Sequence, residues 1–121
     1  MDLAIGPDGS FAVIDGPVLL PRGRWYVNLY SATGEPLRAI QSPSSWLSRV
    51  AYNGHLIAAI GRSGPVFLYD TSGNALLRCN MDKYLSEGMD RFLFLSPDGK
   101  ELRILDGYTQ TLHRFTLPKL E

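Results

Sequence analysis

The amino-acid sequence predicts an all-β protein built from three similar units of short antiparallel strands. Pro7-Asp8-Gly9 recurs as Pro97-Asp98-Gly99, each time between an apolar run and a second run that ends in Asp-Gly. A more divergent copy places Asn53-Gly54 midway, so that successive turn glycines are 45 residues apart. The chain also has 12 glycines and 8 prolines, which fall between apolar runs. This punctuation favours strands and tight turns over helices.

The expected strands follow from the apolar runs between these turns. The first unit, at about residues 2–41, should contain four strands: Leu3–Ile5, Phe11–Ile14, Trp25–Tyr30 and Leu37–Ile40. The second unit, at about 46–80, should contain four more: Leu47–Tyr52, Leu56–Ile60, Val66–Tyr69 and Ala75–Cys79. The third, at about 90–118, should contain only three: Arg91–Leu95, Glu101–Leu105 and Thr111–Thr116. We treat residues 1–121 as a single domain.

Local patterns justify individual elements. The Asp-Gly and Asn-Gly turns, and the glycines Gly34 and Gly73 in two later turns, supply the positive φ that tight hairpins require. Glu101–Leu105 alternates between polar and apolar residues over most of its length, which predicts a strand with one wetter face. Leu56–Ile60 does not alternate, so we expect it to be covered on both faces.

A period of about 40–50 residues made of short strands and tight turns is typical of β-propeller blades. The segments Ile5–Asp15, Leu68–Leu77 and Leu95–Asp106 resemble the repeats of NHL-type and YVTN-type β-propellers. Those repeats combine an apolar strand, a Pro-Asp-Gly turn and a strand that ends near an Asp, followed by an aromatic-Asp-x-x-Gly hairpin. The chain departs from them at Gly61, which replaces the strand-end Asp. The resemblance implies a propeller-type fold and assigns no catalytic residue.

Three blades are too few for a closed propeller, which needs about 4–8. An isolated arc would leave two terminal sheet faces uncovered, and Phe92, Phe94 and Phe115 make the third unit far from polar. We therefore expect a homodimer that closes a six-bladed ring, because twofold symmetry is the commonest in homo-oligomers. The fourth strand of the last blade would be absent, donated by another chain or lost by truncation. The alternative is that these residues belong to a longer propeller.

Composition limits the classes of partner and site. The 12 basic residues balance the 12 acidic ones, so we expect neither nucleic-acid binding nor attachment to an anionic membrane. Cys79 is the only cysteine, which excludes an internal disulfide and a cysteine-rich metal site. Asp2, Pro7 and Asp8 interrupt the N-terminus before a signal-peptide core can form, and no run is long enough to span a membrane. We therefore expect a soluble cytoplasmic protein.

A candidate binding face comes from the long connections, because irregular loops on a rigid scaffold commonly carry function. In an up-and-down meander the connections Gly16–Arg24, Gln41–Trp46 and Asn80–Asp90 lie at the end opposite the short turns. The candidate ligand-binding residues at this end are Arg22, Arg24, Trp46, Arg62, Asp82, Lys83, Tyr84 and Tyr108. Mixed charge with aromatic residues suits a protein, peptide or sugar partner. The alternative is structural, with Trp46 sealing a blade junction and the arginines solvated.

Catalytic or metal chemistry has little support in the sequence. His55 and His113 lack metal-like spacing, and Asp15 and Asp106 are better explained as turn-forming carboxylates. No phosphate loop or nucleophile elbow occurs, so we expect no catalytic residue, metal or cofactor. The leading hypothesis is a non-enzymatic binding or scaffold module for a protein or peptide. The alternatives are a lectin-like carbohydrate binder and, with less support, a metal-dependent propeller hydrolase or lyase.

Overall fold

A computed structural model describes residues 2–16, 24–43, 47–61, 64–81 and 91–118. The strands in these residues are β1 (Asp2–Ile5), β2 (Phe11–Asp15), β3 (Tyr26–Tyr30), β4 (Pro36–Gln41), β5 (Leu47–Tyr52), β6 (Leu56–Gly61), β7 (Pro65–Asp70), β8 (Ala75–Asn80), β9 (Arg91–Leu95), β10 (Glu101–Asp106) and β11 (Thr111–Thr116). Every predicted strand is present, and every strand end lies within one residue of the predicted one. No helix occurs within the described ranges, and therefore none that could cross a membrane.

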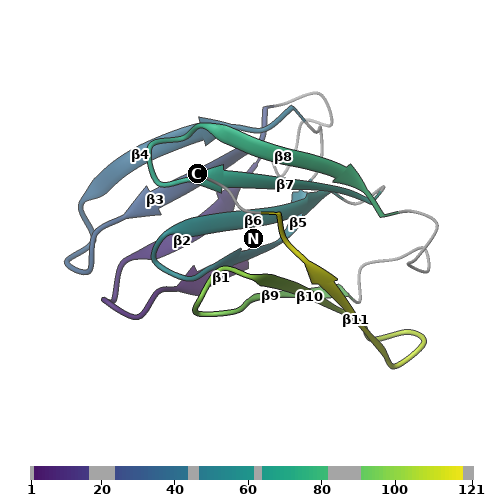
Figure 1. The fold of residues 1–121 in the computed structure, drawn as a ribbon. Coiled ribbons are helices and arrows are strands. Elements are labelled where there is room, and N and C mark those ends of the chain that lie inside the picture. The colour runs from purple at the N-terminus through teal and green to yellow at the C-terminus, as the bar shows by residue number, and fades with distance from the viewer. Residues whose placement is uncertain (1, 17–23, 44–46, 62–63, 82–90, 119–121) are drawn as a thin grey trace.

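The strands form three separate antiparallel sheets, which do not close into a ring (Figure 1). Sheet 1 has the order β1-β2-β3-β4, sheet 2 the order β5-β6-β7-β8, and sheet 3 the order β9-β10-β11. The first strands of the sheets lie side by side, since β1 contacts β5 and β5 contacts β9. The fourth strands β4 and β8 lie at the opposite edges of their sheets. All-β architecture with 4, 4 and 3 strands is therefore as the sequence predicts.

Sheet 2 lies between the other two and supplies both hydrophobic cores. One core joins sheets 1 and 2, with Ile14 and Val27 packed in the same cluster as Ile57 and Phe67. The second joins sheets 2 and 3 through residues such as Leu68 and Ile104. Strand β6 is buried along nearly its whole length, as its apolar run without alternation predicts. Strand β10 alternates between buried and half-buried residues, again as expected.

The turns between β1 and β2, β3 and β4, β5 and β6, β7 and β8, and β9 and β10 lie at one end of the three sheets. Glycines 9, 34, 54, 73 and 99 all have positive φ, between 74° and 95°, which confirms their predicted role in the hairpins. Neighbouring turns contact each other, because the Asn53 side-chain amide donates to the Ser96 carbonyl oxygen at 3.1 Å. At the opposite end the Ser42 amide donates to the Trp25 carbonyl oxygen, and the Met81 amide donates to that of Gly64.

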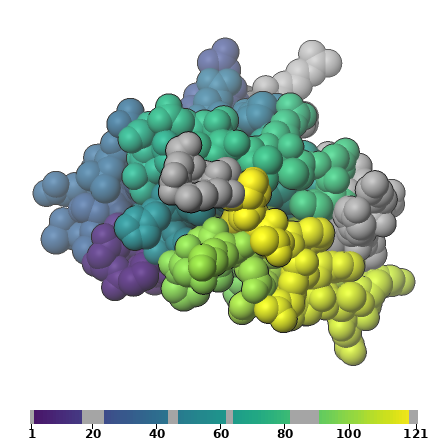
Figure 2. Space-filling model, in the orientation of Figure 1, coloured from purple at the N-terminus to yellow at the C-terminus, as the bar shows by residue number. Residues whose placement is uncertain are grey.

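Sheet 3 ends at β11 within the described residues, and the segment that follows folds back toward sheet 2. The Leu117 amide donates to the Lys100 carbonyl oxygen at 2.7 Å. The Leu117 side chain packs against the second core. In Figure 2 the yellow end of the described chain lies against the teal and green surface of sheet 2. The outer edge of β11 has no paired strand among the described residues.

Aspartate side chains hold several of the turns. Oδ1 of Asp8, Asp70 and Asp98 accepts a backbone N–H two residues ahead, from Ser10, Ser72 and Lys100 respectively. Side-chain hydrogen bonds are the main cause that lowers the pKa of each carboxyl below its ordinary value of 3.8: from Ser10 to Asp8, from Asn74 to Asp70 and from Ser96 to Asp98. The charged carboxylates therefore favour the folded state.

We expect acid to remove this stabilisation. Because the folded pKa values are depressed, the contribution is complete above the ordinary carboxyl value of 3.8 and is lost as the pH falls through the lower folded values. The urea midpoint should stay level down to about pH 5 and fall below about pH 4. Asp70→Asn keeps an acceptor for the turn amides but cannot titrate, so its stability should fall less in acid. An acid profile identical to that of the wild type would contradict this assignment for Asp70.

Candidate functional site

The predicted loop-face residues are only partly covered by the structure. Arg22, Trp46, Arg62, Asp82, Lys83 and Tyr84 lie outside the described residues, so their predicted role stays a prediction. Arg24 is exposed just before β3, and Tyr108, in the turn between β10 and β11, is 78% exposed. These two residues flank strands of the two outer sheets, and no hydrogen bond among the described residues joins them.

The residues considered as catalytic or metal-binding candidates lie in strands and turns and do not form a shared site. His55 is exposed after the β5–β6 turn, and His113 is half-buried within β11. Oδ1 of Asp106 accepts the backbone N–H groups of Tyr108 and Thr109, at 3.1 and 3.3 Å, so Asp106 forms the predicted turn. Cys79 is half-buried in β8. In the described part of the chain, no three His, Cys, Asp or Glu side chains are grouped as a metal site would require.

The pairing registers show that the three sheets share one plan. We call the face that a sheet turns toward the next sheet its forward face, and the opposite side its rear face. The central pair of the rear face is Phe11–Tyr30 in sheet 1, Ile57–Tyr69 in sheet 2 and Leu102–Phe115 in sheet 3. Both internal junctions pack a forward face on a rear face. Consequently the rear face of sheet 1 and the forward face of sheet 3 are the two open faces.

The open rear face of sheet 1 carries apolar residues whose equivalents are buried elsewhere. Leu3 corresponds by register to Val50 and Leu93, which are 5% and 7% exposed, whereas Leu3 itself is 52% exposed. Ile5, next on this face, is 66% exposed. Phe11 and Tyr30 stack here with their ring centroids 5.1 Å apart. This face has apolar residues like those of an internal junction, but no sheet among the described residues covers it.

The first three strands of sheets 1 and 2 carry nearly identical forward faces. Equivalent positions carry the same residue types: Ala4 and Ala51, Ala12 and Ala58, Ile14 and Ile60, Val27 and Val66, and Leu29 and Leu68. In sheet 3 the same positions hold Phe94, Arg103, Leu105, Leu112 and Arg114. Glu101 accepts from Arg103 Nε at 3.3 Å and from Arg114 Nε and Nη2 at 3.0 Å each. The open forward face is thus apolar in part and charged in part.

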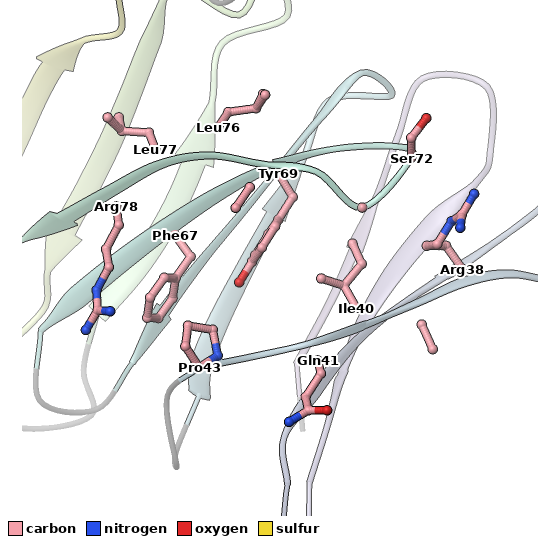
Figure 3. A pocket seen from close by; sticks show the side chains of 13 residues that line it. Arg38, Ile40, Gln41, Pro43, Phe67, Tyr69, Ser72, Leu76, Leu77 and Arg78 are labelled. Carbon is pink, nitrogen blue, oxygen red and sulfur yellow. The ribbon is translucent and has the colours of Figure 1, made fainter.

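A pocket of about 650 Å³ opens between sheets 1 and 2, on the side of β4 and β8 (Figure 3). Its lining includes Ile40 and Phe67, with Arg38 from β4 and Arg78 from β8. Tyr69 extends from β7 into the space between Phe67 and Ile40. Tyr69 is 4% exposed, and its hydroxyl has no hydrogen-bond partner among the described residues. Burial raises the pKa of the Tyr69 phenol, an effect that the charge of Arg78 opposes.

Sequence reasoning missed this pocket, because its polar groups lie within strands and not in loops. Arg38 faces the junction from the forward side of sheet 1, opposite Leu29, and Arg78 faces it from the rear side of sheet 2, opposite Phe67. The available signal was that each arginine interrupts an apolar fourth strand. The register that turns both toward one junction is not visible from the sequence.

The junction between sheets 2 and 3 contains a smaller pocket of different chemistry. It measures about 220 Å³, and apolar residues such as Leu77, Met81 and Phe115 line it. The two junctions therefore differ in their pockets. A sugar-binding propeller with repeated sites would need the same pocket at each junction. Neither a protein-family model nor a curated protein sequence matches this chain.

Two tyrosine substitutions should have opposite effects on stability. An unpaired buried hydroxyl costs about 1–3 kcal/mol, so Tyr69→Phe should raise the free energy of unfolding by as much as ~1 kcal/mol. Tyr52 provides the matched control, because its hydroxyl lies 2.8 Å from the Ser10 hydroxyl in a shared hydrogen bond. Tyr52→Phe should lower the free energy of unfolding by about 1 kcal/mol. Urea denaturation measures both, and equal losses in the two variants would contradict an unpaired Tyr69 hydroxyl.

Proposed function

We propose that the chain is a three-blade β-propeller segment that acts as a non-enzymatic binding scaffold, and that two copies associate head to tail into a six-bladed ring. The observation that carries this proposal is the rear face of sheet 1. Its apolar positions match those that are buried in sheets 2 and 3, so they are suited to the same kind of cover. Contiguous exposed apolar faces commonly mark an interaction site.

A head-to-tail arrangement is supported by the fact that one open face is a forward face and the other is a rear face. Each internal junction places a forward face on a rear face, and the open pair consists of one face of each kind. Such a heterologous contact produces a closed ring when repeated rotation from one copy to the next returns to the first copy. Two copies would provide six blades, within the usual range of about 4–8. A rear-to-rear dimer would not use the packing geometry of the internal junctions.

The charged residues on sheet 3 are compatible with this contact. Arg103 and Arg114 face outward beside Leu112, while the rear face of sheet 1 offers the stacked rings of Phe11 and Tyr30. Guanidinium groups stack on aromatic rings, and this contact gains about 0.5–2 kcal/mol depending on exposure. The junction between copies would thus be more polar than the two junctions within a chain.

The ring would collect the irregular connections of both copies at one end. Arg24 and Tyr108, the two described members of the predicted binding set, are exposed at this end. A protein or peptide is the partner that mixed charge and exposed aromatic rings favour. A glycan array tests the carbohydrate alternative: binding of a defined sugar that excess peptide does not displace would overturn the assignment of a protein or peptide partner.

Two single substitutions test the head-to-tail contact. Leu3 and Leu112 are both 52% exposed in one chain, so changing either should not disturb the folding of that chain. The equivalents of Leu112 are Val27 and Val66, which are 0% and 4% exposed. We expect the wild type to have twice the chain mass of 13.4 kDa by light scattering, and Leu3→Glu or Leu112→Glu to weaken association at least tenfold. Lys100→Glu, away from both open faces, is the control.

Mixing the two variants distinguishes the possible arrangements. In a head-to-tail pair, the intact forward face of Leu3→Glu can meet the intact rear face of Leu112→Glu, so an equimolar mixture should regain dimer through one sound junction. A dimer made of two rear faces would respond to Leu3→Glu alone and would not be rescued by mixing. A wild type that remains monomeric at high concentration would contradict the ring.

A further inference from the structure

We propose that the pocket between sheets 1 and 2 binds the carboxylate of a small organic acid, through the Tyr69 hydroxyl and the guanidinium group of Arg78. The pocket is formed within one chain, so this inference does not depend on the ring. Its volume of about 650 Å³ lies in the range of about 300–1,000 Å³ that is usual for small-molecule sites.

The Tyr69 hydroxyl is the first observation that points to a ligand. Buried polar groups are nearly always hydrogen-bonded, yet this hydroxyl has no partner among the described residues. The register equates Tyr69 with Phe115 in sheet 3, so a phenylalanine fills the same rear-face position there. Packing therefore does not require the oxygen. A ligand acceptor in the pocket would satisfy the hydroxyl and explain why tyrosine occupies this position.

The charge of the walls is the second observation. Arg38 and Arg78 belong to opposite sheets, and no Asp or Glu is among the described residues that line the pocket. No described carboxylate forms an ion pair with either arginine. Arg78 lies 5.4 Å above the centre of the Phe67 ring, which holds its guanidinium over the wall of the pocket. At the other end, the Gly73 backbone lies close to the side chains of Arg38 and Ile40, so the hairpin closes the pocket there.

These groups favour a carboxylate carried by an apolar body. Burial raises the pKa of Tyr69, so at neutral pH the phenol is protonated and donates a hydrogen bond. Arginine offers paired donors that match the two oxygens of a carboxylate. The remaining lining, including Ile40, Pro43 and Phe67, is apolar and would contact a hydrocarbon or ring. A free organic acid and the C-terminal residue of a peptide share this chemistry.

Titration with acetate, hexanoate and phenylacetate, followed by backbone amide NMR, tests the site. We expect phenylacetate and hexanoate to shift the amides of β4, β7 and β8, and to bind more tightly than acetate. Phenylacetamide has the same shape without the charge and should bind at least tenfold more weakly. Acetyl-Gly-Phe with a free C-terminus, compared with its amide, distinguishes a peptide source from a free acid. Tighter binding of the free-carboxylate peptide than of phenylacetate would assign the site to peptide C-termini.

Three variants locate the contacts. Tyr69→Phe should weaken phenylacetate binding about tenfold while its melting temperature is unchanged or higher, because one hydrogen bond to a charged group is lost and an unpaired buried hydroxyl is removed. Arg78→Ala should weaken binding by a similar factor, and Lys100→Ala, at an exposed turn, should not. The proposal is wrong if none of the acids shifts these amides, if acid and amide bind equally, if inorganic phosphate binds more tightly than phenylacetate, or if Tyr69→Phe leaves affinity unchanged.

Discussion

The structure depends on covering both faces of each sheet with another sheet. A sheet of short strands has little to stabilise it until its apolar face leaves water, and each buried leucine or isoleucine side chain contributes about 1.5–3 kcal/mol. Sheet 2 meets this requirement on both sides, which is why β6 can consist of Leu56–Gly61 without a polar face. Sheets 1 and 3 meet it on one side only. The half-exposed residues Leu3 and Leu112 are the direct consequence.

The positions of the strands were predictable because turn chemistry is local. The face of the sheet on which each side chain lies was not predictable. When the repeats are aligned by their turn glycines, Ala12 becomes the equivalent of Leu102. The pairing register instead equates Phe11 with Leu102, because the turns that follow Ile5 and Leu95 differ by one residue. A slip of one residue exchanges the two faces of a strand. The sequence could therefore predict eleven strands but not which residues meet at a junction, nor that Arg38 and Tyr69 share a pocket.

The two internal junctions and the open forward face differ in a way that bears on assembly. Ala12 and Leu29 in sheet 1 are matched by Ala58 and Leu68 in sheet 2, but by Arg103 and Arg114 in sheet 3. Both arginines pair with Glu101 at the surface, where solvent screening leaves such exposed pairs little effect on stability. They can therefore be reoriented at small cost when another surface approaches. The apolar neighbours Phe94 and Leu112 would provide the burial that holds such a contact together.

The pocket between sheets 1 and 2 and the open faces occupy different parts of each sheet, so neither need interfere with the other. Strands β1, β5 and β9 lie side by side, while β4 and β8, which supply Arg38 and Arg78, lie at the far edges of their sheets. Closure of a ring through the open faces would leave this edge at the perimeter and accessible to a ligand. Both walls of the pocket also belong to one packed core, so the position of the Tyr69 hydroxyl is fixed before a ligand arrives. A donor held in this way loses little conformational freedom when a ligand binds, so more of the hydrogen-bond energy contributes to affinity.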